Sequence, residues 1–452
     1  NKTTDTNEMI MDKLKIAVVG SGISGLSAAW LLSKRHQVTV FEAESQLGGH
    51  ANTVDVSTPD GPVAVDTGFI VYNEQNYPNL TALFNHLDVP TDGTEMSFAL
   101  SFNGGEYEYA ASNADGYFGQ RRNLLKPRHW RLLNEISRFF KTAQNRIRHY
   151  PAYTSLGSFL SQEGYSDAFV SDHIIPMGAS IWSTAMSRMK EFPASGFIDF
   201  YANHGMLQFN QRPHWRTVSG GSRSYVNRVA SDGNFETLLN APVRHIRRAE
   251  NHVYITDKSG EIRPFDHVVI ATHADQALRM LSEPDEQESK ILGAFGYQTN
   301  MAVLHRDPRW MPKRRKLWSS WNYLKESRGY EPQLCMTYWM NRLQNLDTKT
   351  ELFVTLNPMS DINEKAVDGS YAYEHPVFSY EAVQAQSDLW SLQGRNRTWF
   401  CGSYFGYGFH EDGAQSGLAV AEQLGGERRP WQVENESGRI KLGPDAALAA
   451  AE

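Results

Sequence analysis

A glycine-rich turn near the start of the chain has the residue types and spacing of a phosphate-binding loop. It reads Gly20-Ser21-Gly22-Ile23-Ser24-Gly25. In such a turn the first glycine permits a tight bend, the second lets a pyrophosphate approach the backbone, and the third lets the following helix pack closely. Glu42 lies twenty residues after Gly22, where a carboxylate accepts hydrogen bonds from ribose hydroxyls and repels a 2′-phosphate. The pattern predicts a dinucleotide site that disfavours NADP.

The elements that must position this turn are also readable. Residues 14–19 form a short apolar run typical of a β-strand, and apolar residues between 23 and 31 recur at helical spacing. A second apolar run, 38–41, ends immediately before Glu42. A helix that begins at the turn offers free N–H groups and its positive dipole end to phosphate. Strand, turn, helix, strand and acid therefore follow in the order of a Rossmann-type fold.

The residues after the acid resemble a known family. The stretch from Glu42 to His50 reads EAESQLGGH, which resembles the FAD fingerprint of the flavin amine oxidase superfamily, a group that also holds phytoene desaturases and protoporphyrinogen oxidases. The family usually has arginine after the glycine pair, near the pyrophosphate. Here His50 takes that place, and a neutral imidazole can still donate a hydrogen bond to phosphate. The resemblance implies further cofactor contacts from Ala43, Glu44, Gly48 and Gly49.

Three later segments resemble parts of the same nucleotide-binding domain. Residues 65–69 resemble an Asp-x-Gly segment that passes close to the flavin ring. Residues 242–246 resemble a strand whose backbone meets the adenine, and residues 266–272 resemble the strand that returns to the FAD. The contacts implied by these segments come from Thr67, Gly68, Phe69, Val243, Ala271 and Thr272.

The longest late motif, residues 400–417, reads FCGSYFGYGFHEDGAQSG and continues at helical spacing to Leu424. The N-terminus of such a helix can direct its dipole at the pyrimidine carbonyl of a flavin. In the family this loop gives that carbonyl a backbone N–H, here from Glu411 or Asp412. The resemblance places His410 beside the ring as a candidate base or orienting group. Weaker catalytic candidates are Tyr404 and Tyr407, and the other expected cofactor contacts are Gly402, Ser403, Gly413 and Ser416.

Together these segments predict an α/β protein with a discontinuous, Rossmann-type FAD-binding domain and an inserted α+β substrate domain. The FAD-binding domain is expected at 14–80, 216–282 and 395–425, and the substrate domain at 83–212 and 288–392. The substrate segments are rich in Trp, Tyr, Phe and Met, which suit a deep apolar pocket. Residues 1–12 and 426–452 are expected to be tails.

Composition narrows the class further. Among the 452 residues 40% are hydrophobic and 21% charged, an ordinary globular balance. The net charge of −7 gives no reason to expect nucleic-acid binding. The two cysteines, Cys335 and Cys401, lie far apart, so neither a disulfide framework nor a metal site is expected, and neither resembles a site of covalent flavin attachment. No apolar run is long enough to span a bilayer, and we expect a cytoplasmic protein.

Two stretches mix cations with aromatic residues. Residues 121–150 contain one acid, Glu135, among many Arg and Lys, and residues 309–318 form a second basic stretch. One hypothesis is peripheral docking on an anionic bilayer, at the inner face of the membrane, from which a lipid substrate is drawn. The alternative is a solvated helix whose apolar stripe packs inward.

Three functions stay open. The resemblance implies hydride transfer from a substrate C–H to the flavin, which makes C=C or C=N. His50 and the His410-Glu411-Asp412-Gly413 loop resemble a bacterial amine-oxidase-like subgroup associated with modified fatty acids, which favours oxidation or desaturation of a small apolar or fatty-acyl substrate. The alternatives are an amine or polyamine oxidase and a flavin-binding protein without turnover. The electron acceptor, the reaction direction and the oligomeric state are not determined.

Overall fold

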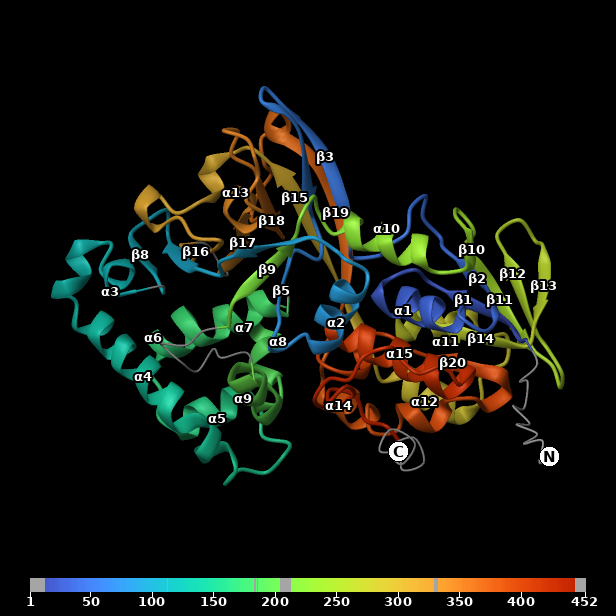
Figure 1. Cartoon of the computed structure of the whole chain (residues 1–452). Helices are drawn as coiled ribbons and strands as arrows, with labels where there is room; N and C mark the ends of the chain where they lie inside the picture. The colour runs from blue at the N-terminus through green and yellow to red at the C-terminus, as the bar shows by residue number, and fades with distance from the viewer. Residues whose placement is uncertain are drawn as a thin grey trace, which may run out of the picture.

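The computed structural model describes residues 13–111, 113–182, 184, 186–203, 213–328 and 332–443. The expected tail at 1–12 lies outside the described residues, as does the stretch 444–452 of the expected second tail. Figure 1 shows two halves that meet along the centre of the molecule.

One half, on the right of Figure 1, is built on a five-stranded sheet in which every neighbouring pair is parallel. In β1 and β2 an exposed first residue is followed by four buried ones. Parallel strands that are covered on both faces read as such continuous apolar runs. The strands in spatial order are β10 (Phe235–Leu238), β2 (Gln37–Phe41), β1 (Lys15–Val19), β14 (His267–Ile270) and β20 (Thr398–Phe400).

Two helices, α1 (Ile23–Leu32) and α15 (His410–Gly425), pack closely against each other in this half. Every residue of α1 is buried. A Cβ atom on Gly417 would lie 2.2 Å from the Ser24 carbonyl oxygen, and one on Gly25 would lie 1.9 Å from the Gly20 carbonyl oxygen. Glycine is therefore required at both positions for the helices and strand to approach so closely.

An antiparallel sheet and several more helices belong to this half. The sheet contains β11 (Val243–Arg248), β12 (Val253–Asp257) and β13 (Ile262–Phe265). The helices are α10 (Arg223–Asp232), α11 (Ala274–Met280) and α12 (Glu286–Gly293).

The other half has a seven-stranded mixed sheet, in which β16 and β7 pair in parallel and the other neighbours are antiparallel. A group of helices lies below this sheet on the left of Figure 1. The strands in spatial order are β19 (Val367–Val377), β15 (Gly296–His305), β18 (Phe353–Leu356), β17 (Gln333–Trp339), β16 (Trp321–Glu326), β7 (Phe98–Phe102) and β8 (Tyr107–Ala110). The larger helices are α4 (Pro127–Ile147), α5 (Leu156–Gln162), α7 (Ile175–Ile181), α8 (Met186–Glu191) and α9 (Ala194–Asn203).

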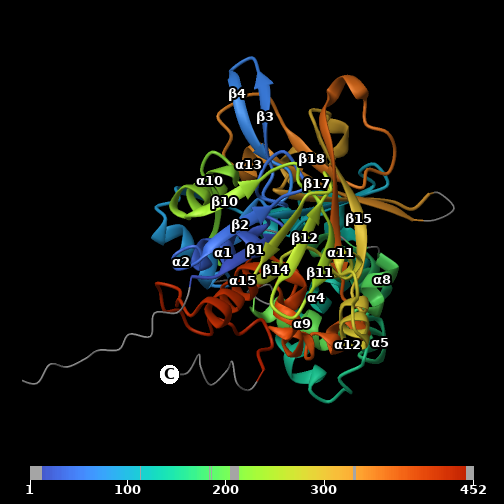
Figure 2. The same ribbon diagram turned by 90° about the vertical axis from the view of Figure 1, so that its right-hand side faces the viewer.

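Smaller elements complete the described chain. Figure 2 shows the hairpin of β3 (Thr53–Thr58) and β4 (Gly61–Asp66) at the top of the molecule. A small antiparallel sheet has the order β5 (Val71–Asn73), β9 (Trp215–Val218) and β6 (Thr91–Thr94). The remaining α-helices are α2 (Pro78–His86), α3 (Ala114–Tyr117), α6 (Asp167–Phe169), α13 (Met340–Leu343) and α14 (Tyr380–Ala385).

The architecture confirms the predicted α/β class. The parallel strands come from each of the three stretches expected to form the nucleotide-binding domain. The boundaries between the two domains differ from the expected ones. Buried residues between 83 and 89 and the end of α12 with Phe295 belong to the core of the nucleotide-binding half, although they were expected in the substrate domain. The same holds for buried residues between 382 and 392.

The described part of the expected second tail, residues 426–443, packs against this half. Trp431 stacks on Trp30 with ring centroids 5.8 Å apart. The buried Arg429 donates to Glu422 at 2.7 Å. A few specific contacts hold this segment in place. The low apolar content of the segment, which suggested a tail, does not reveal such contacts.

Candidate active site

A cavity of about 1340 Å³ lies between the halves and is lined by residues of both. Its wall includes the turn after β1, the ends of β2 and β14, the loop before α15, and β19. Most of the residues expected to bind the cofactor line it. They are Gly20, Ser21, Gly22, Ile23, Ser24, Glu42, Ala43, Glu44, Gly49, His50, Thr67, Gly68, Phe69, Val243, Ala271, Thr272, Gly402 and Ser403.

The turn after β1 leaves room for a ligand against its backbone. Gly20 has φ +99°, and its Cβ would meet the Ala271 carbonyl oxygen at 2.7 Å. Gly22 differs, because a Cβ there would meet nothing within 4 Å. Glu42 is buried, and its carboxylate accepts hydrogen bonds from the Ser21 hydroxyl and, at 3.1 Å, from the Ser21 backbone N–H. The acid therefore holds the glycine turn in place and stands beside the open space.

The glycine pair and the Asp-x-Gly segment close around this turn. Gly49 has φ +57°, and its Cβ would lie 3.1 Å from the Gly22 Cα. A Cβ on Gly68 would lie 2.1 Å from the His50 carbonyl oxygen. The Asp66 carboxylate is buried and accepts from the Ser222 backbone N–H at 2.9 Å. Because burial outweighs these hydrogen bonds, the pKa of Asp66 is raised to about 6.

The side chains of some expected cofactor contacts have structural roles. The fully buried Glu411 carboxylate accepts from the backbone N–H groups of Asn79 and Leu80, at 3.1 and 2.9 Å, and so caps α2. Asp412 accepts from the Phe409 backbone N–H at 2.8 Å. Their contact with a flavin through a backbone N–H stays a prediction. Outside the lining residues are Gly25, Gly48, Glu411, Asp412, Gly413 and Ser416, of which Ser416 bonds the Gly402 backbone through its hydroxyl.

The three catalytic candidates, His410, Tyr404 and Tyr407, all line the cavity but in different settings. The His410 ring stacks on Phe69 with centroids 3.7 Å apart, and its Nε2 lies 3.0 Å from the Tyr225 hydroxyl. Burial lowers the pKa of His410 to about 3, so its imidazole is neutral at physiological pH. Tyr404 is 2% exposed and belongs to the core of the nucleotide-binding half.

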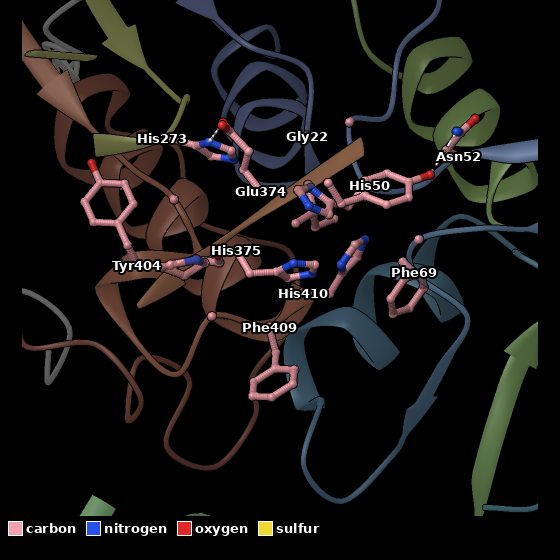
Figure 3. Close-up of a pocket in the computed structure, with 18 of the residues that line it drawn as sticks. Gly22, His50, Asn52, Phe69, His273, Glu374, His375, Tyr404, Phe409 and His410 are labelled. Carbon is pink, nitrogen blue, oxygen red and sulfur yellow. Dashed lines mark hydrogen bonds and ion pairs between the residues drawn. The ribbon is translucent and has the colours of Figure 1, made fainter. Parts of the chain in front are cut away.

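A group of histidines meets at the centre of the cavity, and two of them, His273 and His375, belong to no motif found in the sequence. Figure 3 shows His50, His375 and His410 gathered in the cavity, and His273 paired with Glu374. The His50 ring lies 5.3 Å from His375 and 6.2 Å from His273, centroid to centroid. Burial, followed by the neighbouring histidines, holds the pKa of His50 well below its ordinary value. Burial likewise lowers the pKa of His375 to about 4.

These pKa shifts make the histidine group neutral at physiological pH. His273 keeps a lowered pKa because burial outweighs Glu374, whose carboxylate lies 3.3 Å from the His273 Nδ1. His273 could have been suspected, because it lies three residues after the end of β14 and the carboxyl ends of parallel strands face the ligand. Glu374 and His375 lie in a strand with no recognisable motif, so only the fold brings them to the site.

The far end of the cavity is apolar. Trp182 is one of the aromatic residues expected to build a substrate pocket, and it lies here, while Met336 and Met340 are core residues. Tyr407 faces this end, with its ring 5.8 Å from that of Phe200. The apolar lining includes Met96, Phe98, Phe140, Met177, Ile181, Trp182, Phe200, Tyr338, Phe378 and Phe409.

The two basic stretches, 121–150 and 309–318, pack into the fold in different ways. In the stretch 309–318, Arg314 pairs with the fully buried Glu108 at 2.7 Å, and Trp310 and Trp318 are buried. Arg314 and the two tryptophans are therefore structural, while Lys313 and Lys316 are exposed. In α4 the apolar stripe packs inward, and membrane docking of this stretch stays a prediction. None of the described helices is both long and apolar enough to cross a membrane.

The nucleotide end of the cavity fits a bound flavin dinucleotide. The space over Gly22 has the position that a pyrophosphate needs above a helix N-terminus. The buried His50 Nε2 has no hydrogen-bond partner among the described residues, and a buried polar atom of this kind calls for a partner. Within the same residues no group of three His, Cys, Asp or Glu side chains is arranged to hold a metal ion.

Comparison with known proteins identifies the family. The model of the family described as flavin containing amine oxidoreductase matches residues 23–342. This match covers more than half of the chain, so the protein belongs to that family and is an FAD-dependent oxidoreductase. A carotenoid phi-ring synthase of Streptomyces griseus is 39% identical over 79 residues, which are 17% of this chain and 15% of that protein. The chain thus matches only a small part of this relative's length.

Solved structures share the fold at low sequence identity. A fatty acid isomerase from P. acnes, described as producing CLA, is 14% identical with a TM-score of 0.63, and the match covers 91% of this chain and 98% of that one. Putrescine oxidase bound to putrescine is 15% identical with a TM-score of 0.63, over 91% and 99% of the two chains. Cyclohexylamine oxidase from Brevibacterium oxydans is 13% identical with a TM-score of 0.62, over 91% and 99%. At these identities the likeness shows the fold alone.

Proposed function

We propose that the protein holds FAD non-covalently and oxidises, by desaturation, an apolar substrate of the fatty-acyl class. The observation that carries this proposal is the cavity itself, which continues from the glycine turn into an apolar chamber lined by aromatic residues and methionines. Its volume of about 1340 Å³ exceeds the roughly 300–1,000 Å³ of an ordinary small-ligand site. A cofactor at one end therefore leaves space for a substrate at the other.

Non-covalent binding is supported by the positions of the two thiols. Cys335 and Cys401 are both buried and lie outside the residues that line the cavity. Burial raises the pKa of each thiol to about 12, so neither is a reactive thiolate at neutral pH.

The charges around the cavity favour an apolar substrate over an amine. Among the described lining residues, the carboxylates are Glu42, Glu44 and Glu374. The first two stand at the nucleotide end, and Glu374 is engaged with His273. A cationic amine in the apolar end would lose its hydration without an ionic partner, which is costly. The structure of putrescine oxidase shares the fold, so amine oxidation is the second candidate.

The chain's own residues bind and orient the substrate. When bound, FAD supplies the hydride acceptor, and dioxygen or another oxidant must then reoxidise it. The apolar end holds an acyl chain and excludes water. Stacking on Phe69 and the hydrogen bond with Tyr225 fix the His410 ring, which supports an orienting role for His410 in the wall beside the reacting carbon.

The test is anaerobic mixing of the FAD-loaded protein with oleic acid, with a phosphatidyl ester of oleate or with putrescine, followed by the visible spectrum. We expect bleaching by an acyl compound and none by putrescine. Met177→Lys, which places a charge in the apolar end, should abolish bleaching and leave the FAD spectrum intact. Met301→Lys, at a side chain that is 41% exposed, is the matched control. Bleaching by putrescine alone would establish the amine oxidase, and bound FAD that no compound reduces would indicate a protein without turnover.

We further propose that a small exposed apolar patch, which we call the cap, docks on an anionic bilayer. The cap consists of Leu124, Leu125 and Trp130, whose side chains are 44%, 86% and 51% exposed. Exposed Arg122 flanks it, whereas the neighbouring Arg128 is exposed but paired with a buried aspartate. Apolar side chains that insert at the interface and cations that meet acidic headgroups together favour peripheral binding.

This docking can be measured by sedimentation with vesicles at low salt. The protein should pellet with phosphatidylglycerol vesicles and not with phosphatidylcholine vesicles. Leu125→Glu should release it, whereas Ile262→Glu, at a site in the other half that is 61% exposed, should not. Equal pelleting of both variants would overturn the docking surface.

A further inference from the structure

A chain of side-chain amides connects a backbone N–H of β15 to His375 in the cavity wall. The Met301 backbone N–H donates to the Asn357 Oδ1 at 2.9 Å. The Asn357 Nδ2 donates to the Asn300 Oδ1 at 2.7 Å. The Asn300 Nδ2 lies 2.9 Å from the His375 Nδ1. Asn300 is fully buried, while His375 lines the cavity.

The backbone amide at one end decides which atom donates at every later contact. A backbone N–H is always a donor, so the Asn357 atom that faces Met301 must be its oxygen. The other Asn357 atom is then a donor, and the Asn300 atom that receives it must be an oxygen. The amide nitrogen of Asn300 is left to face His375, whose Nδ1 must accept.

A further contact supports this orientation, and the backbone of Asn357 is itself fixed in place. The Asn300 Nδ2 also lies 3.5 Å from the Gln298 carbonyl oxygen, which can only accept. Asn357 has φ +48° and follows directly after β18. Asparagine tolerates this left-handed conformation better than most residues, and Asn357 also donates its own backbone N–H to the Met301 carbonyl oxygen at 2.8 Å.

We infer that Asn357 and Asn300 are positioning residues that hold His375 as the neutral Nε2–H tautomer, a fixed hydrogen-bond donor for a negatively polarised oxygen of the bound ligand. An imidazole whose Nδ1 accepts carries its proton on Nε2, on the other edge of the ring. Since Nδ1 faces the buried Asn300, Nε2 faces away from it. A neutral imidazole in this role polarises an oxygen as an electrophile and does not act as a base.

The surroundings keep this tautomer neutral. Protonation of Nδ1 would break the bond to Asn300 and create a charge beside His50 and His273. Burial and the proximity of His273 both lower the pKa of His375. Glu374, the neighbouring acid, is engaged with His273. The identity of the ligand rests on the proposed function. The tautomer of His375 rests on the hydrogen bonds alone.

The tautomer can be read directly by nuclear magnetic resonance. Protein labelled with ring ¹⁵N-histidine is recorded by long-range ¹H–¹⁵N correlation at neutral pH, as purified and after saturation with FAD, and His375→Gln identifies the signals. We expect the proton of His375 on Nε2. A proton on Nδ1, or an imidazolium, would overturn the inference. This readout requires no turnover, so it stands or fails separately from the oxidation of any substrate.

Two isosteric variants test whether the amides impose the tautomer. In Asn357→Asp both side-chain oxygens accept, so Asn300 must turn its amide and present its oxygen to His375. The proton should then move from Nε2 to Nδ1. Asn300→Asp should force the same change from the middle of the chain. The control is Asn363→Asp at an exposed residue whose side chain caps Lys365 and can do so as an aspartate. Folded variants of both positions that keep the proton on Nε2 would overturn the relay.

The source of the oxygen is assigned by adding FAD and decanoate separately. A shift of the His375 Nε2–H signal with FAD alone assigns the oxygen to the flavin. A shift that needs decanoate assigns it to the substrate carboxylate. If neither compound, alone or together, moves the signal, His375 does not donate to a ligand.

Discussion

The two ends of the cavity are built in different ways. At the nucleotide end, Gly20, Gly22 and Glu42 come from one short stretch and act through backbone shape and one carboxylate. At the centre, His50, His273 and His375 come from three distant stretches and act through side chains. A site that recognises phosphate through the backbone is therefore visible as a local motif. A site made of side chains from separate strands becomes visible only when the strands are placed.

The strongest test of this contrast is a pair of glycine substitutions in one turn. Gly25→Val should abolish folding, because its Cβ would lie 1.9 Å from the Gly20 carbonyl oxygen and 3.1 Å from the Ala271 Cβ. Gly22→Ala should leave the FAD-free fold intact, since Gly22 has φ −64° and its Cβ meets no atom within 4 Å. It should still weaken FAD binding at least tenfold, or about 1.4 kcal/mol, by occupying space needed by the pyrophosphate. Thermal unfolding of the FAD-free protein and titration with FAD measure the two effects.

Equal loss of folding in both glycine variants would show that the turn is simply a packing feature. Unchanged FAD affinity in Gly22→Ala would mean that the open space is not the pyrophosphate site.

The stability of the half with the seven-stranded sheet should depend on buried side-chain ion pairs and not on glycine positions. Arg314→Ala removes the ion pair to the fully buried Glu108. Breaking a buried pair leaves an uncompensated charge, and because the Arg314 side chain is 35% exposed we expect a loss of about 3 kcal/mol, at the low end for such pairs. Urea unfolding measures it. Arg309→Ala in the same stretch is the control, since Arg309 is 72% exposed and its pair should contribute less than about 1 kcal/mol. Similar losses in both would contradict the structural role of Arg314.

The smallest predicted effect is a pH dependence in the seven-stranded sheet. The His305 Nδ1 accepts from the Asp307 backbone N–H at 3.1 Å, and its Nε2 bonds the Thr355 hydroxyl at 2.7 Å. Burial lowers the pKa of His305 to about 4. Between this value and about 6.5 the unfolded chain binds more protons than the folded one, so stability falls as the pH falls through that window. His305 should contribute a loss of about 1.5 kcal/mol between about pH 6.5 and pH 5.

Urea unfolding at the two pH values checks this. His305→Gln should remove that part of the loss, and His252→Gln, at an exposed histidine, should not. An unchanged pH slope in His305→Gln would show that His305 is not held neutral by the fold.

Particular residues show how far the sequence could be interpreted. The turn at 20–25, the acid at 42 and the helix that begins at His410 follow rules of local geometry, and each lies where the motif predicts. The sequence suggested a role only for the backbone of Glu411, and its side chain caps α2, a contact across more than three hundred residues. The basic stretch at 309–318 suggested a membrane surface, but Arg314 is engaged with Glu108. Charge composition does not show which cations have internal partners.

The sequence by itself determined the nucleotide-binding half, because glycine positions and strand periodicity are short-range properties of the backbone. It also determined the family, through two motifs at opposite ends of the chain. Only the tertiary structure decided which side chains face the reaction. His375 and Asn300 lie diagonally across β19 and β15, and Asn357 joins them from the end of β18. Such a group depends on strand register, and register is set by long-range packing that a single sequence does not display.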